Sequence, residues 1–378
     1  MDKIHIAIVT NNYKPYSGGV VSSIESFTTQ LIEFGHKISI ITLDFAGHNE
    51  SDPSYVHRIK CPIKFRYKTN PIGIPWRHNH AVIKKIAELK PDLIHSQHPF
   101  LLGKAALKAG KKLKIPIIFT YHTRYEEYAH YLPLPTNISR PIIKKIALRY
   151  CKKVDALIAP TQSTKNFLLE NGIKIPISII PSGIPEIFFQ PAKKTVISNS
   201  FRLLSVSRFT KEKNIIFLLN VLNKLGLHFH LTLVGYGPEL ENLKNYAFVT
   251  LKIPENKLEF IISPTKAELV QIYQNSDIFI FGSKSETQGI VLAEAMASGL
   301  PVIALDAPGA CDIIENGKNG FLVRNQDKMV EKIEFLQINR ELLKKYSENA
   351  RSTGQKYSIS ETAAQLINCY QKYTNSAF

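Results

Sequence analysis

Short apolar runs rich in β-branched residues alternate with longer stretches of helical periodicity, and this alternation occurs twice along the chain. The pattern predicts βαβ units, in which helices cover both faces of a parallel sheet. The strand candidates are residues 4–10, 37–43, 92–97, 115–121, 156–160 and 177–180 in the first half, and 202–207, 230–234, 258–262, 278–281, 301–305 and 320–323 in the second. Each half is therefore expected to form a Rossmann-like α/β domain.

A segment rich in Pro, Ser and Lys separates the two halves. We place a hinge linker at residues 184–199, between an N-terminal domain of residues 1–183 and a C-terminal domain of residues 200–356. Residues 357–378 carry a last helix that is expected to pack back on the N-terminal domain. Because such sheets bind ligands at the carboxyl ends of their strands, the two domains are expected to face each other across a cleft that holds the chemistry.

The composition is that of a globular protein. Hydrophobic residues make up 44% of the 378 residues and charged residues 21%, which excludes a disordered chain. The four cysteines lie far apart without the spacing of a zinc site, which suits a reducing compartment. The first residues resemble a strand rather than a signal peptide, and no apolar run is long enough to span a membrane. We expect a cytoplasmic protein, free or bound at the inner membrane surface.

The positive charge is concentrated in the first half. The chain has a net charge of +17, and residues 1–190 contain 26 Lys and Arg against 13 Asp and Glu. An anionic partner is therefore expected, and the absence of an RNP-type or helix-turn-helix motif argues against nucleic acid. Between residues 61 and 80, aromatic and apolar residues alternate with basic ones. This segment is predicted to be a loop that either inserts into a membrane interface or packs on its own domain.

A basic amphipathic helix is predicted at residues 139–153. Its apolar side would consist of Ile142, Ile143, Ile146, Ala147 and Tyr150, and its basic side of Arg140, Lys145, Arg149, Lys152 and Lys153. The candidates for membrane or acceptor contact are Lys144, Lys145, Arg149, Lys152 and Lys153. Such helices lie on anionic membranes, although a helix whose apolar side packs on its own sheet has the same pattern. The charge of this half favours the membrane, and we assign these basic residues to the membrane or acceptor side.

The most specific motif runs from Ser283 to Pro301, where a strand leads through a loop into a helix. Glu286 lies in the loop and can hold sugar hydroxyls, while Glu294 in the helix can accept bonds from a ribose. The N-terminus of this helix, close to Gly289, offers free N–H groups and the positive end of its dipole to a phosphate. Arg208 and Lys213, after the first strand of the second half, supply two cations for a departing diphosphate.

These residues resemble glycosyltransferase family 4, whose members are retaining, nucleotide-sugar-dependent enzymes with the two-domain GT-B fold. The E-x7-E signature of the family matches Glu286 and Glu294, and its Arg and Lys match Arg208 and Lys213. Gly18 and Gly19 resemble the family's glycine loop, and Gly235 resembles its second glycine turn. The resemblance implies donor-binding roles for these residues and for the residues around the helix start, Thr287, Gln288, Gly289 and Ile290.

The segment Thr120 to Pro133 resembles the subgroup that glucosylates diacylglycerol. The resemblance implies that His122 lines the donor sugar and diphosphate, and that Tyr125 and Tyr128 lie on the acceptor side. His122, Glu286, Arg208 and Lys213 are thus the expected catalytic residues. It further implies a front-face reaction in which the acceptor attacks from the side of the leaving group and a diphosphate oxygen takes its proton.

The expected reaction moves a hexose, most plausibly glucose from UDP-glucose, to a diacylglycerol-type lipid. No metal or other cofactor is expected, because the D-x-D pair that holds manganese in other nucleotide-sugar transferases is missing. Two alternatives stay open. One is a mannosyl- or galactosyltransferase of the same family that acts on phosphatidylinositol, lipopolysaccharide or a soluble acceptor, and the other is a non-catalytic lipid-binding protein that kept the fold. The sequence leaves the oligomeric state open.

Overall fold

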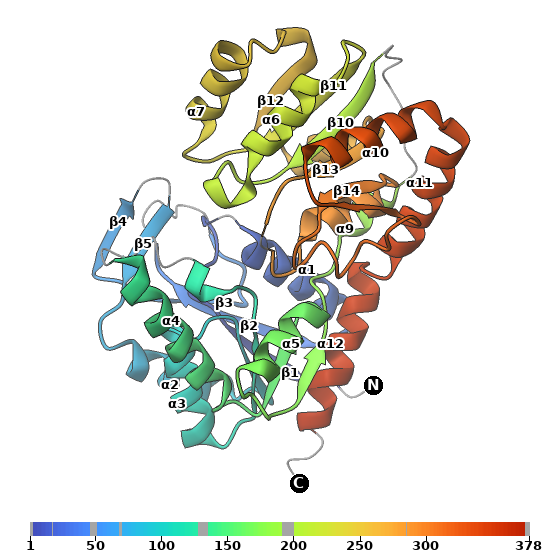
Figure 1. The fold of residues 1–378 in the computed structure, drawn as a ribbon. Helices are drawn as coiled ribbons and strands as arrows, with labels where there is room; N and C mark the ends of the chain where they lie inside the picture. Colours follow the sequence, from blue (N-terminus) through green and yellow to red (C-terminus); the bar gives the residue numbers. More distant parts are fainter. Residues whose placement is uncertain are drawn as a thin grey trace. The chain divides into compact units, whose positions relative to one another are not determined.

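The computed structural model describes residues 3–16, 18–45, 51–67, 70–127, 135–190, 200–284 and 286–374. The chain divides into two compact units. The first comprises Met1–Gly183 and Ile359–Phe378, and the second comprises Ile184–Ser358. Each unit is built around one parallel β-sheet (Figure 1). No helix within the described ranges is both long and apolar enough to cross a bilayer.

The first unit has a seven-stranded sheet in the order β3-β2-β1-β6-β7-β8-β9. Its strands are β1 (His5–Val9), β2 (Lys37–Leu43), β3 (Val56–Ile59), β6 (Leu93–Ser96), β7 (Ile117–Thr120), β8 (Ala156–Ala159) and β9 (Ile177–Ile179). The chain runs outward from β1 to β3 and then returns to the other side of β1, at β6. The order therefore reverses between β1 and β6, which is where open α/β sheets bind ligands.

Helices cover both faces of this sheet. They are α1 (Gly19–Glu33), α2 (His78–Leu89), α3 (Leu102–Leu113), α4 (Thr136–Cys151), α5 (Gln162–Glu170) and α12 (Ile359–Thr374). Buried residues of α2 to α5 share one hydrophobic core with the sheet, and buried residues of α1 and α12 share another. The last helix of the chain thus belongs to the first unit, beside α1 (Figure 1).

The second unit has a six-stranded sheet in the order β12-β11-β10-β13-β14-β15. Its strands are β10 (Phe201–Val206), β11 (Phe229–Gly235), β12 (Leu258–Ile262), β13 (Ile278–Phe281), β14 (Val302–Leu305) and β15 (Gly320–Val323). Here the order reverses between β10 and β13, so the loops that follow these two strands are neighbours at the carboxyl edge of the sheet.

Helices cover both faces of the second sheet as well. They are α6 (Ile215–Lys224), α7 (Leu240–Asn245), α8 (Lys266–Gln274), α9 (Ile290–Ala297), α10 (Gln326–Ile338) and α11 (Arg340–Gln355). Residues of α6 and α10 share one core, and residues of α8 and α9 share the other. Helix α8 begins with a capping box in which the Thr265 hydroxyl accepts from the Glu268 N–H and the Glu268 carboxylate accepts from Thr265.

The structure differs from the prediction of a linker over residues 184–199. Residues Glu186–Phe189 form a 3-10 helix, and the Phe188 side chain is buried in a core of the second unit against Tyr273. Residues 184–190 therefore belong to the second unit. The chain reads as a linker there because its three apolar residues are flanked by prolines, which gives too short a segment for periodicity. Residues 191–199 lie outside the described residues.

Three strands were not predicted from the sequence. One is β3, and the other two, β4 (Ile63–Tyr67) and β5 (Asn70–Ile74), pair in an antiparallel hairpin that is separate from the seven-stranded sheet. The segment from 61 to 80, predicted to be a loop, is thus this hairpin followed by the start of α2. Basic residues interrupt the apolar positions of β3 and β4, and Asn70, Pro71 and Gly73 interrupt those of β5. None of the three strands therefore shows the apolar run that marks a buried strand.

Candidate active site

In the second unit, the candidate residues gather where the strand order reverses. Arg208 and Lys213 follow β10, and Glu286 follows β13. Lys213 ends the 3-10 turn Lys211–Lys213, and Asn214 then adopts a left-handed conformation before α6 begins. The Asn214 side chain donates to the Gly282 carbonyl at 3.0 Å, which ties the loop after β10 to the end of β13.

Lys213 and Glu286 form an ion pair with each other. The Lys213 ammonium donates to Glu286 Oε1, and both side chains are largely buried. The backbone N–H of Glu286 donates to the Pro308 carbonyl at 3.3 Å, and a Cβ on Gly309 would lie 2.6 Å from the Glu286 Cβ. Three adjacent loops thus fix the position of this carboxylate, and the glycine after Pro308 is required for their close approach.

Arg208 is held without a carboxylate partner. No ion pair joins it to an acidic residue in the parts of the chain that the structure describes, and its buried Nε has no hydrogen-bond partner there. Its guanidinium lies 5.9 Å from the centre of the Tyr236 ring. Arg208 is half-buried, and a buried guanidinium nitrogen without an acceptor is costly, so this arrangement suits an anion such as a diphosphate.

Gly235, assigned to donor binding, has a clear packing role. A Cβ at this position would lie 1.8 Å from the Ser207 carbonyl oxygen, so only glycine allows β11 to approach the loop after β10. Its neighbour Gly237 approaches the Phe209 carbonyl in the same way. Both glycines therefore shape the loop that carries Arg208.

Helix α9 begins at the predicted place. Gly289 is its N-cap in a left-handed conformation (φ 70°), and the half-buried Ile290 is its first residue. Gln288 is buried and Thr287 is half-buried in the loop before it. The first N–H groups of a helix have no partner within it, so this end of α9 is suited to bind a phosphate.

Glu294, in the middle of α9, is hydrogen-bonded within the second unit. Its Oε2 accepts from the hydroxyl of the buried Tyr273 at 3.0 Å. Burial raises the pKa of the Glu294 carboxyl, which the Tyr273 bond partly opposes. The carboxylate is thus oriented by α8 before any ligand arrives.

In the first unit, a polar cluster lies where that sheet reverses its strand order. His98, two residues after β6, accepts at Nδ1 from the Asn11 N–H at 3.2 Å and lies 3.3 Å from the Thr10 hydroxyl. Thr10 and Asn11 follow β1, so His98 joins the two loops. Burial lowers the pKa of His98 to about 4. The imidazole is therefore neutral at pH 7.

His122 and Gln97 form the next pair along this edge. The amide oxygen of Gln97 accepts from His122 Nε2 at 2.5 Å, which leaves His122 Nδ1 as a hydrogen-bond acceptor. Burial lowers the pKa of His122 to about 3. The predicted catalytic histidine is thus a neutral imidazole of fixed tautomer, suited to accept a hydroxyl rather than to shuttle protons.

His95, on β6, is hydrogen-bonded on both sides of its ring. His95 Nε2 lies 2.7 Å from the Thr120 hydroxyl, and His95 Nδ1 lies 2.6 Å from the hydroxyl of Tyr370 on α12. Burial lowers the pKa of His95 to about 3. His95, Gln97, Thr120, His122 and Tyr370 all line one cavity of about 20 Å³, room for roughly one water molecule.

The predicted glycine loop precedes α1. Gly18 is the N-cap of α1 and Gly19 is its first residue, so the free N–H groups at the start of this 15-residue helix follow the loop. The nearest atom to a Cβ on Gly18 would be a ring carbon of Tyr16 at 3.5 Å. Nothing crowds this position, so packing does not demand the glycine.

Helix α4 differs from its predicted pattern. Ala147 and Tyr150 are buried, and Tyr150 donates to Ser96 at 2.8 Å, as expected of the side that faces the core. Ile142, assigned to that side, is instead exposed, as is Ile138 one turn earlier. The helix begins at Thr136 rather than at 139, and it includes Pro141, so its core-facing side is shifted relative to the simple wheel.

The basic residues of α4 and its C-terminus divide into two groups. Lys144 is half-buried, with its ammonium 5.2 Å from the centre of the Phe167 ring, so it does not lie on the open surface as predicted. The exposed ones are Lys145, Arg149, Lys152 and Lys153. Tyr125 packs its ring against Phe100 and Tyr121. Tyr128 lies outside the described residues.

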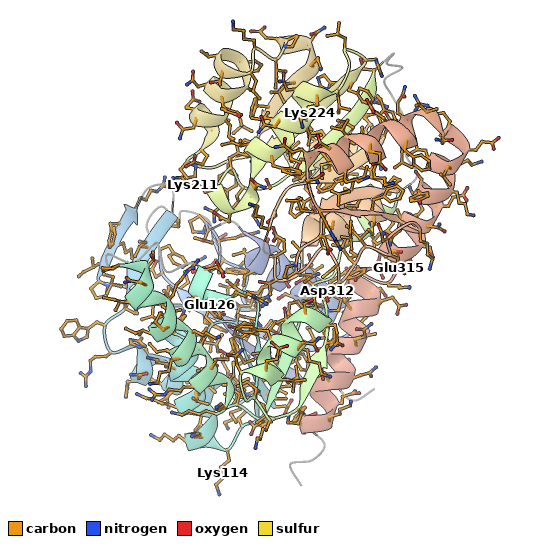
Figure 2. The ribbon with its side chains drawn as sticks, in the orientation of Figure 1. Lys114, Glu126, Lys211, Lys224, Asp312 and Glu315 are labelled. Atoms are coloured by element: carbon orange, nitrogen blue, oxygen red, sulfur yellow. The ribbon has the colours of Figure 1, made fainter. Side chains whose placement is uncertain are left out.

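Figure 2 labels two charged residues of the first unit that illustrate this surface. Lys114, at the end of α3, points away from the unit, whereas Glu126 lies among side chains and has one carboxylate oxygen buried.

No group of three His, Cys, Asp or Glu side chains that could hold a metal ion occurs among the described residues. Metal independence stays a prediction.

Sequence reasoning missed the residues that position the candidates. Gln97 and Thr10 carry no motif of their own, and Tyr370 and Tyr273 look like core residues of helices. The one available signal was position, because Gln97 ends one predicted strand and His122 follows another, and both residues come after the observed strands β6 and β7. Their partners are distant in the chain, so only the folded structure brings them together.

Family models match both units. One described as Glycosyltransferase Family 4 covers residues 17–186, and one described as Glycosyl transferases group 1 covers residues 186–353. An alpha-monoglucosyldiacylglycerol synthase of Streptococcus pneumoniae is 31% identical over 84% of this chain and 75% of that protein. An enzyme of the same name from Acholeplasma laidlawii is 28% identical over 94% of both chains.

The solved structure of Anabaena HepE in complex with UDP-glucose matches 98% of this chain and all of that chain, with a TM-score of 0.78 at 17% identity. This likeness confirms the predicted GT-B fold, in agreement with the two Rossmann-like sheets. The family models and the relative above 30% identity identify the chain as a nucleotide-sugar-dependent glycosyltransferase that belongs to family 4.

Proposed function

We propose that the enzyme transfers glucose from UDP-glucose to the hydroxyl of a diacylglycerol-type lipid, with retention of the α configuration. The observation that carries the proposal is that two relatives, which match most of the chain, have the same name, alpha-monoglucosyldiacylglycerol synthase. Such a name specifies the sugar, the lipid and the anomer of the product.

The arrangement of the second unit supports the donor half of this reaction. When the bond between the sugar C1 and the diphosphate oxygen breaks, negative charge develops on the diphosphate. Arg208, which has no carboxylate partner in the described chain, and the N-terminus of α9 can stabilise that charge. The Lys213 ammonium, which donates to Glu286, would also donate to the diphosphate. The charge of the bound diphosphate would therefore affect the orientation of the Glu286 carboxylate.

The proposed chemistry needs no protein base. The lipid hydroxyl attacks C1 on the face that the diphosphate leaves, and its proton passes to the departing diphosphate oxygen. The Glu286 carboxylate accepts hydrogen bonds from sugar hydroxyls, and Glu294, oriented by Tyr273, accepts from the ribose. Neutral His122 contributes its free Nδ1 as an acceptor for a donor-sugar hydroxyl.

The first unit supports the acceptor half. A diacylglycerol stays in its bilayer, so the enzyme must work at the membrane surface. Helix α4 exposes Ile138 and Ile142 together with Lys145 and Arg149, a combination that suits the interface of an anionic bilayer. We therefore propose a peripheral enzyme that contacts the inner face of the membrane through α4.

The test is an assay with purified enzyme, UDP-glucose and diacylglycerol in mixed micelles that contain anionic lipid, with EDTA in place of added metal. Release of UDP and formation of α-monoglucosyldiacylglycerol are followed together. Glycolipid formation supports donor, acceptor and metal independence at once. UDP release without glycolipid would contradict the proposal that diacylglycerol is the acceptor, while the proposal that UDP-glucose is the donor would stand.

GDP-mannose and UDP-galactose serve as competing donors, and phosphatidylinositol as a competing acceptor, in the same assay. Faster turnover of one of these would replace the proposed substrate with that one. A Glu286→Gln variant should lose transfer but still bind vesicles, which separates an enzyme from a lipid-binding protein that kept the fold.

A further inference from the structure

The β4–β5 hairpin of the first unit presents two different faces. The register pairs Ile63 with Ile74 and Phe65 with Ile72, while Lys64 pairs with Gly73. Because side chains alternate across a strand, the four apolar residues share one face and Lys64 and Gly73 share the other. The hairpin pairs with no strand of the seven-stranded sheet. We call the apolar face, Ile63, Phe65, Ile72 and Ile74, the outer face.

The opposite face is fixed to the body of the unit. The Lys64 ammonium donates to Asp44 Oδ2 at 2.5 Å. A Cβ on Gly73 would lie 2.8 Å from the Asp44 carbonyl oxygen and 2.9 Å from the Cys61 sulfur, so the backbone rests directly on these residues. Since this side is anchored, we infer that the outer face is turned away from the body of the unit, at whose edge the hairpin lies (Figure 1).

The outer face is open to solvent. Ile63 is 57% exposed, Phe65 41% and Ile74 47%, and Trp76, two residues beyond β5, is 76% exposed. Burial of such side chains is worth about 1.5 to 3 kcal/mol each in an apolar surrounding. Contiguous apolar residues of this kind on a surface mark an interaction site, and tryptophan is enriched at membrane interfaces.

The charge around the outer face points to the partner. Residues 53–87 contain eight Lys and Arg and no Asp or Glu, and four of these cations, Arg58, Lys64, Lys84 and Lys85, form ion pairs with carboxylates outside this range. Three of them, Lys60, Arg66 and Arg77, are exposed on or beside the hairpin. Anionic headgroups would satisfy this charge while the apolar side chains enter the acyl region below. A second copy of the chain would bring the same positive charge to the contact and be repelled.

We propose that the outer face of the hairpin and Trp76 insert into the interfacial region of an anionic bilayer. This contact rests on the proposed function and adds to it a second membrane element, apolar where α4 is mainly basic. The hairpin supplies depth of insertion, and the surrounding cations supply the preference for anionic lipid.

Trp76 is the one tryptophan of the chain, so its fluorescence reports on the hairpin directly. Vesicles of phosphatidylglycerol and phosphatidylcholine are added to the full-length enzyme, and bound protein is measured by flotation. We expect the emission to shift to shorter wavelength and to be quenched by lipids brominated on their acyl chains. Protein that floats with the vesicles while its emission stays unchanged would overturn the insertion and leave the proposed membrane enzyme intact.

A pair of variants tests the apolar contribution. Ile63→Ser with Ile74→Ser should lower vesicle affinity at least about tenfold, because the free energy of transferring these two exposed side chains from water into the bilayer is lost. Leu227→Ser in the second unit, at the same 76% exposure as Trp76, is the matched control and should change it less than about twofold. Equal effects of the two changes would contradict the proposal.

Two further outcomes are distinguishable. Wild-type enzyme that does not float at all would overturn both the insertion and the proposed membrane association. A rise in mass with protein concentration in light scattering, abolished by the Ile63 and Ile74 changes, would assign the outer face to a second copy instead. Unchanged UDP affinity of the variant shows that the second unit is intact, and the tryptophan measurement on the wild type does not depend on the variant folding.

Discussion

The two units contain the same kind of sheet but hold their polar groups differently. In the second unit, an ion pair, an unpaired guanidinium and a helix N-terminus are gathered at the point where the strand order reverses. In the first unit, the corresponding edge holds three neutral histidines, His95 and His98 buried and His122 half-buried, that bond to hydroxyls, an amide and a backbone N–H. One edge is built to neutralise charge, and the other to accept and donate neutral hydrogen bonds.

The overall charge of the two units differs in the opposite way from the charge at their strand ends. The first unit carries 27 basic and 13 acidic residues, and the second carries 21 and 18. The excess positive charge thus lies on the unit whose polar edge is neutral. This division teaches that charge for the membrane and charge for the nucleotide are supplied by separate parts of the chain, which allows each to be removed without the other.

The largest effect is expected from Glu286. A Glu286→Gln change removes the charge that orients Lys213 and binds the sugar, and transfer to diacylglycerol should fall by about 10²- to 10³-fold. Glu331→Gln, which breaks exposed pairs with Lys328 and Lys332 in the same unit, should leave the rate unchanged. A similar loss in both variants would show that the second unit responds to any lost carboxylate.

The next effect concerns vesicle binding. Replacing Lys145, Arg149 and Lys152 by Gln should lower the affinity for anionic vesicles about 100-fold, since each cation near the surface contributes about 1 kcal/mol. Lys252, Lys344 and Lys345 of the second unit are equally exposed, and the same change there should have little effect. Flotation at low and high salt measures both, and equal losses would refute the division between the units.

Acid should weaken the first unit before the second. His95, His98 and His122 have pKa values lowered to about 3, 4 and 3, so the fold binds their neutral forms. Their stabilisation is complete above pH 6.5, where the unfolded histidine is also neutral. It falls as the pH drops toward 4, by up to about 1.4 kcal/mol per pH unit for each histidine.

The second unit contains a group, Glu294, whose contribution to stability changes with pH in the opposite direction. Burial raises the pKa of Glu294, so the cost of keeping it ionised is relieved as the pH falls. Hydrogen exchange at pH 7 and pH 5, corrected for intrinsic rates, should show lost protection in β6 and β7 but not in β13 and α9. Earlier loss in β13 and α9 would contradict this account.

The smallest effect is expected from Tyr370. Tyr370→Phe removes the hydroxyl beside His95 Nδ1 and leaves a buried ring nitrogen unpaired, at a cost of about 1 kcal/mol in unfolding free energy. Tyr346 lies in a core of the second unit, and its hydroxyl has no hydrogen-bond partner among the described residues, so Tyr346→Phe should cost less than half of that. Urea unfolding compares the two, and equal values would show that the Tyr370 hydroxyl has no structural role.

Much of the fold can be predicted from the sequence because buried strands appear in it as short runs of apolar residues. The bounds of β2, β12, β13 and β15 are as predicted, and the other strands of the two sheets, apart from β3, agree within two residues. The β4–β5 hairpin was missed because its apolar face is exposed, basic residues alternate with the apolar ones in β4, and a proline and a glycine interrupt β5. The short helix around Phe188 was missed because prolines flank it.

The candidate site divides in the same way. Glu286, Arg208 and Lys213 are recognised because their motifs are local, and the structure brings Lys213 and Glu286 into contact. The partners of the histidines are not recognised, because Tyr370 lies 275 residues from His95 and Asn11 lies 87 from His98. Their roles depend on which strand ends become neighbours.

The most direct test of the division between the units is the affinity for UDP, measured by calorimetry on two variants. Arg208→Ala with Lys213→Ala should weaken UDP binding at least about 100-fold, since each removes a charged contact. The Lys145, Arg149 and Lys152 variant should bind UDP like the wild type. If the first variant keeps its UDP affinity, or the second loses it, the nucleotide site does not lie where the second sheet reverses its strand order, and the account fails.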